Sequence, residues 1–280
     1  MDATARRGLL ASRVVVGLVQ PLQPGNVGAA ARAMRNTGLD DLVLVDPPAF
    51  DPERARWMAP GCADLIAQAR LVPDLETALQ GCQVCYATTA RHRRGRLPVL
   101  EPGELAEQVL DLPSGARAMI LFGREDFGLG KDAVDRCQAL VRIPTPQHAS
   151  LNLAQAVLLV GYALFSEARR RGVVATGRRV GGSRATTTTR ALSKTDARDL
   201  LADLPAMEPA VQDLVRVLER VGYTRGVQPD KVAATLRGAL QRASPSLRQV
   251  DAVRGMAAKI TYALDHPPGA DDDPAEGQGT

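Results

Sequence analysis

The chain has 280 residues, 45% of them hydrophobic and 24% charged, a globular composition that excludes collagenous and wholly disordered proteins. Its net charge of +4 is uneven, because the last ten residues hold four acidic and no basic side chains, so the first 270, with 35 basic and 27 acidic residues, carry +8. Arginine supplies 31 of the 35 basic residues. Because arginine binds phosphate bidentately and stacks on bases, composition leaves two interpretations open, a nucleic-acid partner and a bias of genomic base composition.

The N-terminal apolar run is too short for a signal peptide, and no apolar segment reaches the roughly 18 residues of a transmembrane helix. We therefore expect a soluble, cytoplasmic protein with no membrane partner. The only CxxC pair, Cys82 and Cys85, falls in an apolar run that predicts a strand, where residues three apart point to opposite faces. We expect no metal site, and we interpret these two, Cys62 and Cys137 as buried small hydrophobic residues.

From Arg13 to about Arg171, short apolar runs rich in β-branched residues alternate with helical patterns, which indicates an α/β domain with a mostly parallel sheet. The predicted strands are Val14–Val19, Leu42–Asp46, Val84–Thr88, Ala118–Phe122 and Leu140–Ile143. The predicted helices are Asn26–Thr37, Pro60–Ala69, Asp74–Gln80, Pro102–Leu110, Lys131–Cys137 and a longer one from Ser150 to about Arg169. This last helix is apolar almost all round, which is typical of a helix buried in the core or against another subunit.

The chain changes character after the long helix. Residues 166–195 hold eight basic side chains against Glu167 alone, a net charge of +7, with few apolar groups and no aromatic. We interpret residues 169–192 as a flexible basic linker that captures phosphate backbone, a solvated tether being the alternative. Beyond it, predicted helices at Ser193–Leu204, Glu208–Val221, Pro229–Ala243 and Pro245–Leu264 form a small helical domain over 193–266, and residues 267–280 form an acidic disordered tail.

Familiar nucleotide-binding and hydrolytic motifs are absent from the sequence. Gly123-x4-Gly128 is followed by Leu129, and Gly130-Lys131 is followed by Asp132. The sequence therefore lacks the phosphate-binding loop motif of ATPases, Gly-x4-Gly-Lys-Ser/Thr. No GxGxxG follows the first strand, and no GxSxG supports a hydrolase triad.

Three strand exits instead carry small and polar residues. After the first strand, Asn26 suits a helix N-cap, and Gly28 with Arg32 on the polar helix face would make an anion site. The strand ending at Thr88 leads into a loop with four arginines, Arg91, Arg93, Arg94 and Arg96. The next strand exits lead to Gly123 and Glu125 and to the segment from Ile143 to Asn152. Since open α/β sheets bind ligands at the carboxyl ends of their strands, these exits predict one pocket lined by backbone.

At these residues the chain resembles a known family. NVGAAARAM (residues 26–34, motif one), ILFGREDFGL (120–129, motif two) and IPTPQHASLNLAQAV (143–157, motif three), in this order and spacing, resemble the motifs of the SpoU branch of the SPOUT RNA methyltransferases. The resemblance covers about residues 12–165, so residues 1–168 would form the methyltransferase domain. The helical extension after a charged linker resembles the family's tRNA enzymes that act at position 32 of the anticodon loop.

The resemblance implies a sheet closed by a trefoil knot and a homodimer whose subunits contribute to each other's sites. It implies S-adenosylmethionine as cofactor, held by Thr88, Thr89, Ala90, Gly123, Ile143, Ser150, Leu151 and Asn152. Arg32, Asn26 and Glu125 would be the catalytic residues, and Arg91, Arg93, Arg94 and Arg96 would meet RNA. The family assigns removal of the 2′-hydroxyl proton to the arginine matching Arg32. Because arginine normally stays protonated, a second role is open, orienting a phosphate and stabilising the developing alkoxide.

The sequence therefore predicts an S-adenosylmethionine-dependent 2′-O-methylation of RNA, with a cytidine or uridine at position 32 of tRNA as the expected target. Two alternatives stay open, a ribosomal RNA substrate and a catalytically silent RNA-binding protein on the same fold. The charge of the linker does not discriminate between the RNA substrates, because phosphate contacts carry no sequence information.

Overall fold

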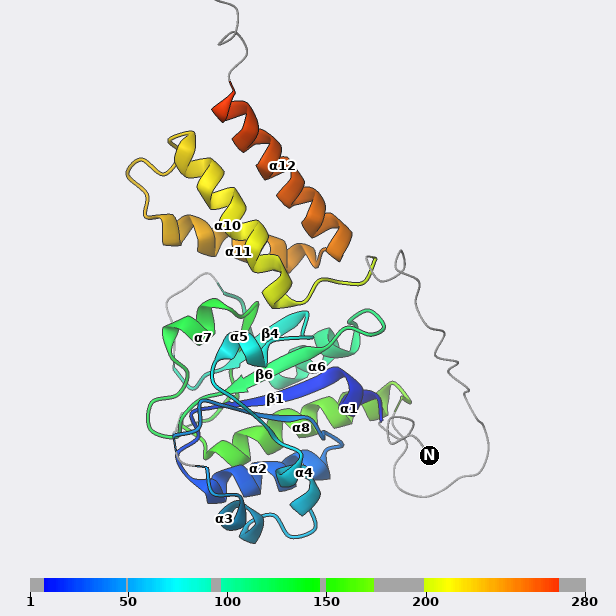
Figure 1. Ribbon diagram of the computed structural model, residues 1–280. Coiled ribbons are helices and arrows are strands. Elements are labelled where there is room, and N and C mark those ends of the chain that lie inside the picture. Colours follow the sequence, from blue (N-terminus) through cyan, green and yellow to red (C-terminus); the bar gives the residue numbers. More distant parts are fainter. Residues whose placement is uncertain (1–7, 49, 92–96, 147–149, 174–198, 267–280) are drawn as a thin grey trace, which may run out of the picture. The chain divides into compact units, whose positions relative to one another are not determined.

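The computed structural model describes residues 8–48, 50–91, 97–146, 150–173 and 199–266 (Figure 1). The chain divides into two compact units, within residues 1–191 and 192–280, and each is described by itself. Most of the predicted linker 169–192 and the whole predicted tail 267–280 lie outside the described residues. No helix in the described part of the chain is both long and apolar enough to cross a membrane.

The first unit is built on a seven-stranded sheet whose paired strands are all parallel, in the order β3-β2-β1-β6-β4-β7-β5. This confirms the predicted parallel α/β architecture. The strands are β1 (Val14–Val19), β2 (Leu42–Val45), β3 (Arg70–Val72), β4 (Val84–Thr88), β5 (Val99–Leu100), β6 (Ala118–Phe122) and β7 (Ala139–Val141). Strands β1, β4 and β6 match their predicted bounds, because each is an apolar run buried along nearly its whole length.

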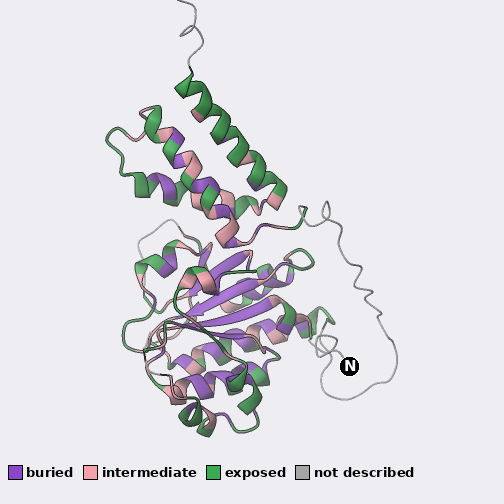
Figure 2. Ribbon diagram, in the orientation of Figure 1, coloured by how far each residue is buried: buried purple, intermediate pink, exposed green. Residues whose placement is uncertain are grey.

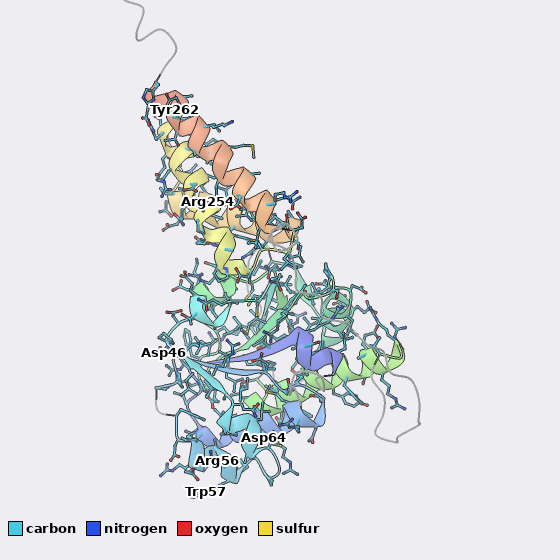
Figure 3. All side chains as sticks on the ribbon, turned by 45° about the vertical axis from the view of Figure 1, so that its right-hand side comes forward. Asp46, Arg56, Trp57, Asp64, Arg254 and Tyr262 are labelled. Carbon is cyan, nitrogen blue, oxygen red and sulfur yellow. The ribbon has the colours of Figure 1, made fainter. Side chains whose placement is uncertain are left out.

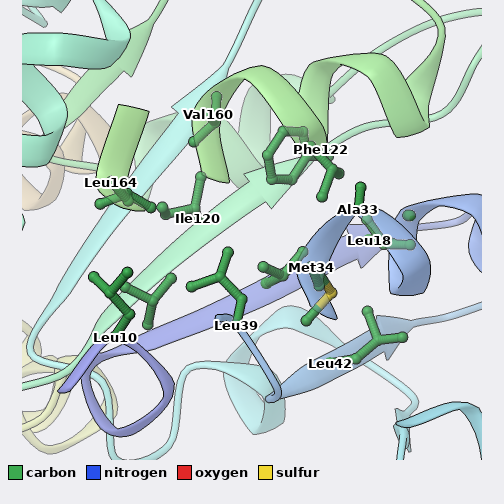
Figure 4. Close-up of a cluster of buried hydrophobic side chains, with 14 of the residues drawn as sticks. Leu10, Leu18, Ala33, Met34, Leu39, Leu42, Ile120, Phe122, Val160 and Leu164 are labelled. Carbon is green, nitrogen blue, oxygen red and sulfur yellow. The ribbon is translucent and has the colours of Figure 1, made fainter. Parts of the chain in front are cut away.

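Helices cover both faces of this sheet: α1 (Leu9–Arg13), α2 (Pro24–Asn36), α3 (Pro52–Trp57), α4 (Ala63–Ala67), α5 (Leu75–Ala78), α6 (Pro102–Leu110), α7 (Lys131–Asp135) and α8 (Leu153–Arg170). Helices α2 and α8 pack together along one face, whereas α5 and α7 lie toward the other (Figure 1). In the core between α2, α8 and the sheet, Met34 belongs to the same buried cluster as Leu18, Ile120 and Phe122 (Figure 4). The central strands of the sheet are therefore buried (Figure 2).

The structure corrects two expectations about α2. The helix begins at Pro24 after Gln23 as N-cap, so Asn26 lies inside the first turn and is not the cap. Proline suits the start of a helix, because it lacks a backbone N–H and the N–H groups of the first turn have no hydrogen-bond partner within the helix. Gly28 does not open an anion site: it is buried, and a Cβ there would overlap the backbone carbonyl of Ala55 in α3. The glycine is needed for close packing of two helices.

We expect Gly28→Ala to lower the free energy of unfolding by about 1–3 kcal/mol, although alanine is the better helix former, because α3 must move to accommodate the methyl group. Urea denaturation of the full chain measures this. Gly25→Ala is the matched control, since its Cβ would meet only Met58 Cγ at 3.5 Å, an ordinary contact. Equal stability of the two variants would contradict the packing role of Gly28.

The second unit is all-helical, as predicted, and holds α10 (Leu204–Arg220), α11 (Pro229–Ala243) and α12 (Leu247–Asp265). Its small core joins Met207 and Ala210 of α10 to Val250 of α12. The predicted helix Ser193–Leu204 is wrong in its described part, residues 199–203, where Leu201 forms an isolated bridge with Ser246. Helix α10 starts at Leu204 because the Asp203 side chain accepts the Ala206 amide and caps it.

Candidate active site

A cavity of about 340 Å³ lies at the carboxyl ends of β6, β4 and β7, which are neighbours in the sheet. This is the edge where open α/β sheets bind ligands, and the volume falls in the range of small-molecule sites. The residues that the family resemblance assigns to a cofactor converge here: the lining includes Thr88, Thr89, Ala90, Gly123, Ile143, Ser150 and Leu151. Asn152 is the exception, because it caps α8 beside the cavity and is not part of its lining.

The loop after β6 forms one wall of the cavity and folds back tightly on itself. The Gly128 amide donates to the Arg124 carbonyl at 2.8 Å, and Gly128 adopts a left-handed backbone with φ of +77°. A Cβ on Gly123 would overlap the backbone of Gly128 and Leu129. Two glycines therefore allow the loop to present its backbone to the cavity.

A polar chain joins the three motifs beside the cavity. The Glu125 carboxylate accepts the Asn26 side-chain amide at 2.9 Å and the backbone amides of Leu22 and Gln23 at 3.0 and 3.3 Å. Asn26 Oδ1 in turn accepts the Asn152 side-chain amide at 3.0 Å. Because a carboxylate accepts hydrogen bonds only, it fixes which end of each amide faces which neighbour. Glu125 thus orients Asn26, and through it Asn152.

The environment of Glu125 keeps it ionised. Partial burial by itself raises the pKa of this carboxyl, but the hydrogen bonds from Leu22, Asn26 and Gln23 outweigh it and hold the pKa below the ordinary value of 4.5. A depressed pKa suits an acceptor that holds its neighbours in place. It does not suit a proton-transferring group at neutral pH.

We expect Glu125→Gln to melt below the wild type at pH 7, with a difference that shrinks as the pH falls. A carboxyl whose pKa is lowered on folding stabilises the fold fully above 4.5, and this contribution is lost as the pH drops through its folded value. Thermal melts between pH 7 and 3 measure the difference. Glu107→Gln, at an exposed position of α6, is the control. A pH-independent difference would show that the charge of Glu125 is not what matters.

Arg32 lies on α2 six residues after Asn26, about 9 Å further along the helix axis. Its side chain is exposed and does not line the cavity. It makes no side-chain hydrogen bond or ion pair with any described residue, whereas nearby Arg35 pairs with Asp64 at 2.5 Å (Asp64 is labelled in Figure 3). The single chain therefore does not bring Arg32 together with the other predicted site residues.

Of the four predicted RNA-binding arginines, Arg91 lines the cavity, and Arg93, Arg94 and Arg96 lie outside the described residues. Sequence reasoning missed Phe127, whose ring also lines the cavity although it is 57% exposed. The only signal for it was its position within motif two, because a lone phenylalanine suggests no chemistry. Within the described residues no cluster of three or more His, Cys, Asp or Glu side chains is arranged to hold a metal ion.

Comparisons with known proteins identify the family of this chain and its relatives. Residues 13–162 match the model of the SpoU rRNA Methylase family. The tRNA (cytidine/uridine/adenosine-2′-O-)-methyltransferase TrmJ of Pseudomonas aeruginosa is 36% identical over 246 residues, covering 87% of this chain and 92% of that protein. The tRNA (cytidine/uridine-2′-O-)-methyltransferase TrmJ of Photorhabdus laumondii is 34% identical, covering 87% and 94%. The crystal structure of TrmJ from Z. mobilis ZM4 superposes with a TM-score of 0.69 at 29% identity, covering 88% and 98%.

Proposed function

The chain belongs to the SpoU rRNA Methylase family, and on that basis we propose that it transfers a methyl group from S-adenosylmethionine to a ribose 2′-hydroxyl of tRNA, at a cytidine or uridine in position 32. The observation that favours tRNA over ribosomal RNA as the substrate is the length of chain that aligns with known tRNA methyltransferases. The relatives named as tRNA methyltransferases align over 87% of the chain, which is more than the methyltransferase unit alone occupies. Because tRNA is the proposed substrate, we expect the protein to act in the cytoplasm.

The cavity suits S-adenosylmethionine by its chemistry. Leu129, Val141 and Ala156 supply an apolar wall for an adenine ring, and the strand exits supply backbone hydrogen-bonding groups for polar parts of the cofactor. Because Gly123 has no Cβ, the backbone of Gly128 and Leu129 can approach it closely and form part of the cavity wall. Thr88, Thr89, Ala90, Gly123, Ile143, Ser150 and Leu151 would hold the cofactor, with Asn152 alongside. When bound, it supplies an electrophilic sulfonium methyl group.

The chain's own residues would align the ribose with that methyl group and help the hydroxyl lose its proton. Alignment at near-attack distance can supply most of the rate enhancement of such a displacement. Glu125 and Asn26 would keep the motif loops in register, as positioning residues. Arg32, cationic and exposed, would hold a substrate phosphate and stabilise the developing alkoxide.

We include a homodimer and the family's trefoil knot in this proposal. Arg32 is outside the cavity of its own subunit, so it would serve the site of a partner. The outer face of α8 supports this, because it exposes Leu158, Leu159 and Tyr162 by 41%, 43% and 61%. Apolar side chains grouped on one helix face are typical of a subunit contact.

Incubation with methyl-labelled S-adenosylmethionine and tRNA transcripts, followed by mapping of the modified nucleotide, tests the function. We expect label in a transcript with cytidine or uridine at position 32 and none in the same transcript carrying a 2′-deoxynucleotide there. Label in ribosomal RNA alone would contradict the proposal that tRNA is the substrate. Absence of label from total RNA would favour a silent RNA-binding protein.

A further inference from the structure

Arg91 and Phe127 are exposed residues of the cavity lining that contact each other, and their exposure places them at its mouth. Arg91 follows β4 and Phe127 belongs to the loop after β6, and both line the cavity. The guanidinium carbon of Arg91 lies 5.3 Å from the centre of the Phe127 ring, over its face. A cation within about 6 Å of an aromatic face is attracted by the ring's quadrupole.

Both partners of this contact are held by their own loops. The Arg91 amide donates to Thr89 Oγ1 at 3.2 Å, and the Thr89 hydroxyl donates to the Arg91 carbonyl at 3.3 Å. Phe127 immediately precedes Gly128, where the loop closes on Arg124. The contact is therefore anchored at the backbone on both sides, and the ring restricts the remaining freedom of a long side chain.

The charge of Arg91 stays available for a ligand. The cavity lining holds two carboxylates, and Asp126 is engaged by Arg124 in a two-point contact at 3.1 and 2.9 Å. Glu125 is occupied by the motif-one loop. Arg91 forms no ion pair with any described residue, so its guanidinium can bind a phosphate while one face rests on the ring.

We propose that Phe127 is a positioning residue, which holds the Arg91 guanidinium at the cavity mouth to receive a backbone phosphate of the RNA next to the reacting ribose. This inference rests on the proposed function. Phe127 would act on RNA binding through Arg91, and it would not contribute to binding of the cofactor. A ring that touched a nucleobase directly would act independently of Arg91.

A double-mutant cycle tests the proposal. The variants are Phe127→Leu, Arg91→Ala and the two combined, together with Phe127→Tyr and Phe127→Trp, which keep an aromatic face. For each full-length protein, kcat and KM for tRNA, the Kd for tRNA by filter binding and the Kd for S-adenosylmethionine by calorimetry are measured. Trp57→Leu, which removes a 78% exposed ring at the end of α3 outside the cavity lining (Trp57 is labelled in Figure 3), is the matched control.

We expect Phe127→Leu to raise KM and Kd for tRNA about fivefold with little change in kcat, and the tyrosine and tryptophan variants to stay close to wild type. The combined variant should be no worse than Arg91→Ala, because Phe127 acts through Arg91. If the losses in tRNA affinity of the two single variants multiplied in the combined variant, the ring would contact a base itself and the proposal would be wrong. Unchanged KM and Kd for tRNA in Phe127→Leu, or a parallel loss of S-adenosylmethionine binding, would also overturn it. An inactive wild type would instead count against the proposed function, and the Kd values for tRNA would still test the role of Phe127.

Discussion

Replacing Arg32 with alanine should lower kcat for tRNA methylation by at least about 100-fold and leave the Kd for S-adenosylmethionine within twofold of wild type. Removing one group that stabilises developing negative charge commonly costs this much. Binding of the cofactor should survive, because the Arg32 side chain is exposed and does not line the cavity. Stability should stay within about 0.5 kcal/mol, as for surface substitutions without partners. Single-turnover methylation, calorimetry and thermal melts measure the three quantities.

Arg32→Lys and Arg35→Ala sharpen the test. Lysine keeps a point charge but not the bidentate geometry, so we expect partial activity. Arg35 shares the exposed surface of α2 but pairs with Asp64, and its loss should leave kcat nearly unchanged. If cofactor binding fell in parallel with activity in Arg32→Ala, the assigned role would be wrong.

The second large effect is expected at Gly123. Gly123→Ala should raise the Kd for S-adenosylmethionine at least tenfold and lower the free energy of unfolding by about 1–3 kcal/mol. The added methyl group would overlap the backbone of Gly128 and Leu129, which cannot retreat without breaking the hydrogen bond from Gly128 to Arg124. The loop that forms the cavity wall would therefore be displaced. Calorimetric titration and urea denaturation measure the two effects.

Gly130→Ala is the matched control in the same connection. A Cβ on Gly130 would meet nothing within 4 Å, and its backbone is extended with φ of −66°. We expect only about 0.5 kcal/mol of destabilisation, because alanine is a poorer N-cap than glycine for α7. If Gly123→Ala bound the cofactor as well as Gly130→Ala does, the backbone wall would not be part of the binding site.

Much of the fold could be predicted from the sequence because its central strands are continuous apolar runs. Strands β1, β4 and β6 and helix α6 were predicted residue for residue. Strands β3 and β5 were missed because they are only three and two residues long. Both lie at the edges of the sheet, and their apolar pairs, Leu71-Val72 and Val99-Leu100, are too short to indicate a strand. Helix α3 was missed as well, since its six residues bury only Ala55.

The sequence by itself determined the α/β class and the order of the three motifs, because apolar runs and motif residues are local features, and the resemblance to the family supplied seven of the residues that line the cavity. Tertiary structure alone decided which of these residues touch. Glu125 meets Asn26 across 99 residues of chain and Asn152 meets Asn26 across 126, and Gly28 serves helix packing and not an anion. It also placed Arg32 outside the cavity and Phe127 under Arg91. Such pairings depend on which strands become neighbours in the sheet, and no local pattern of residues encodes that order.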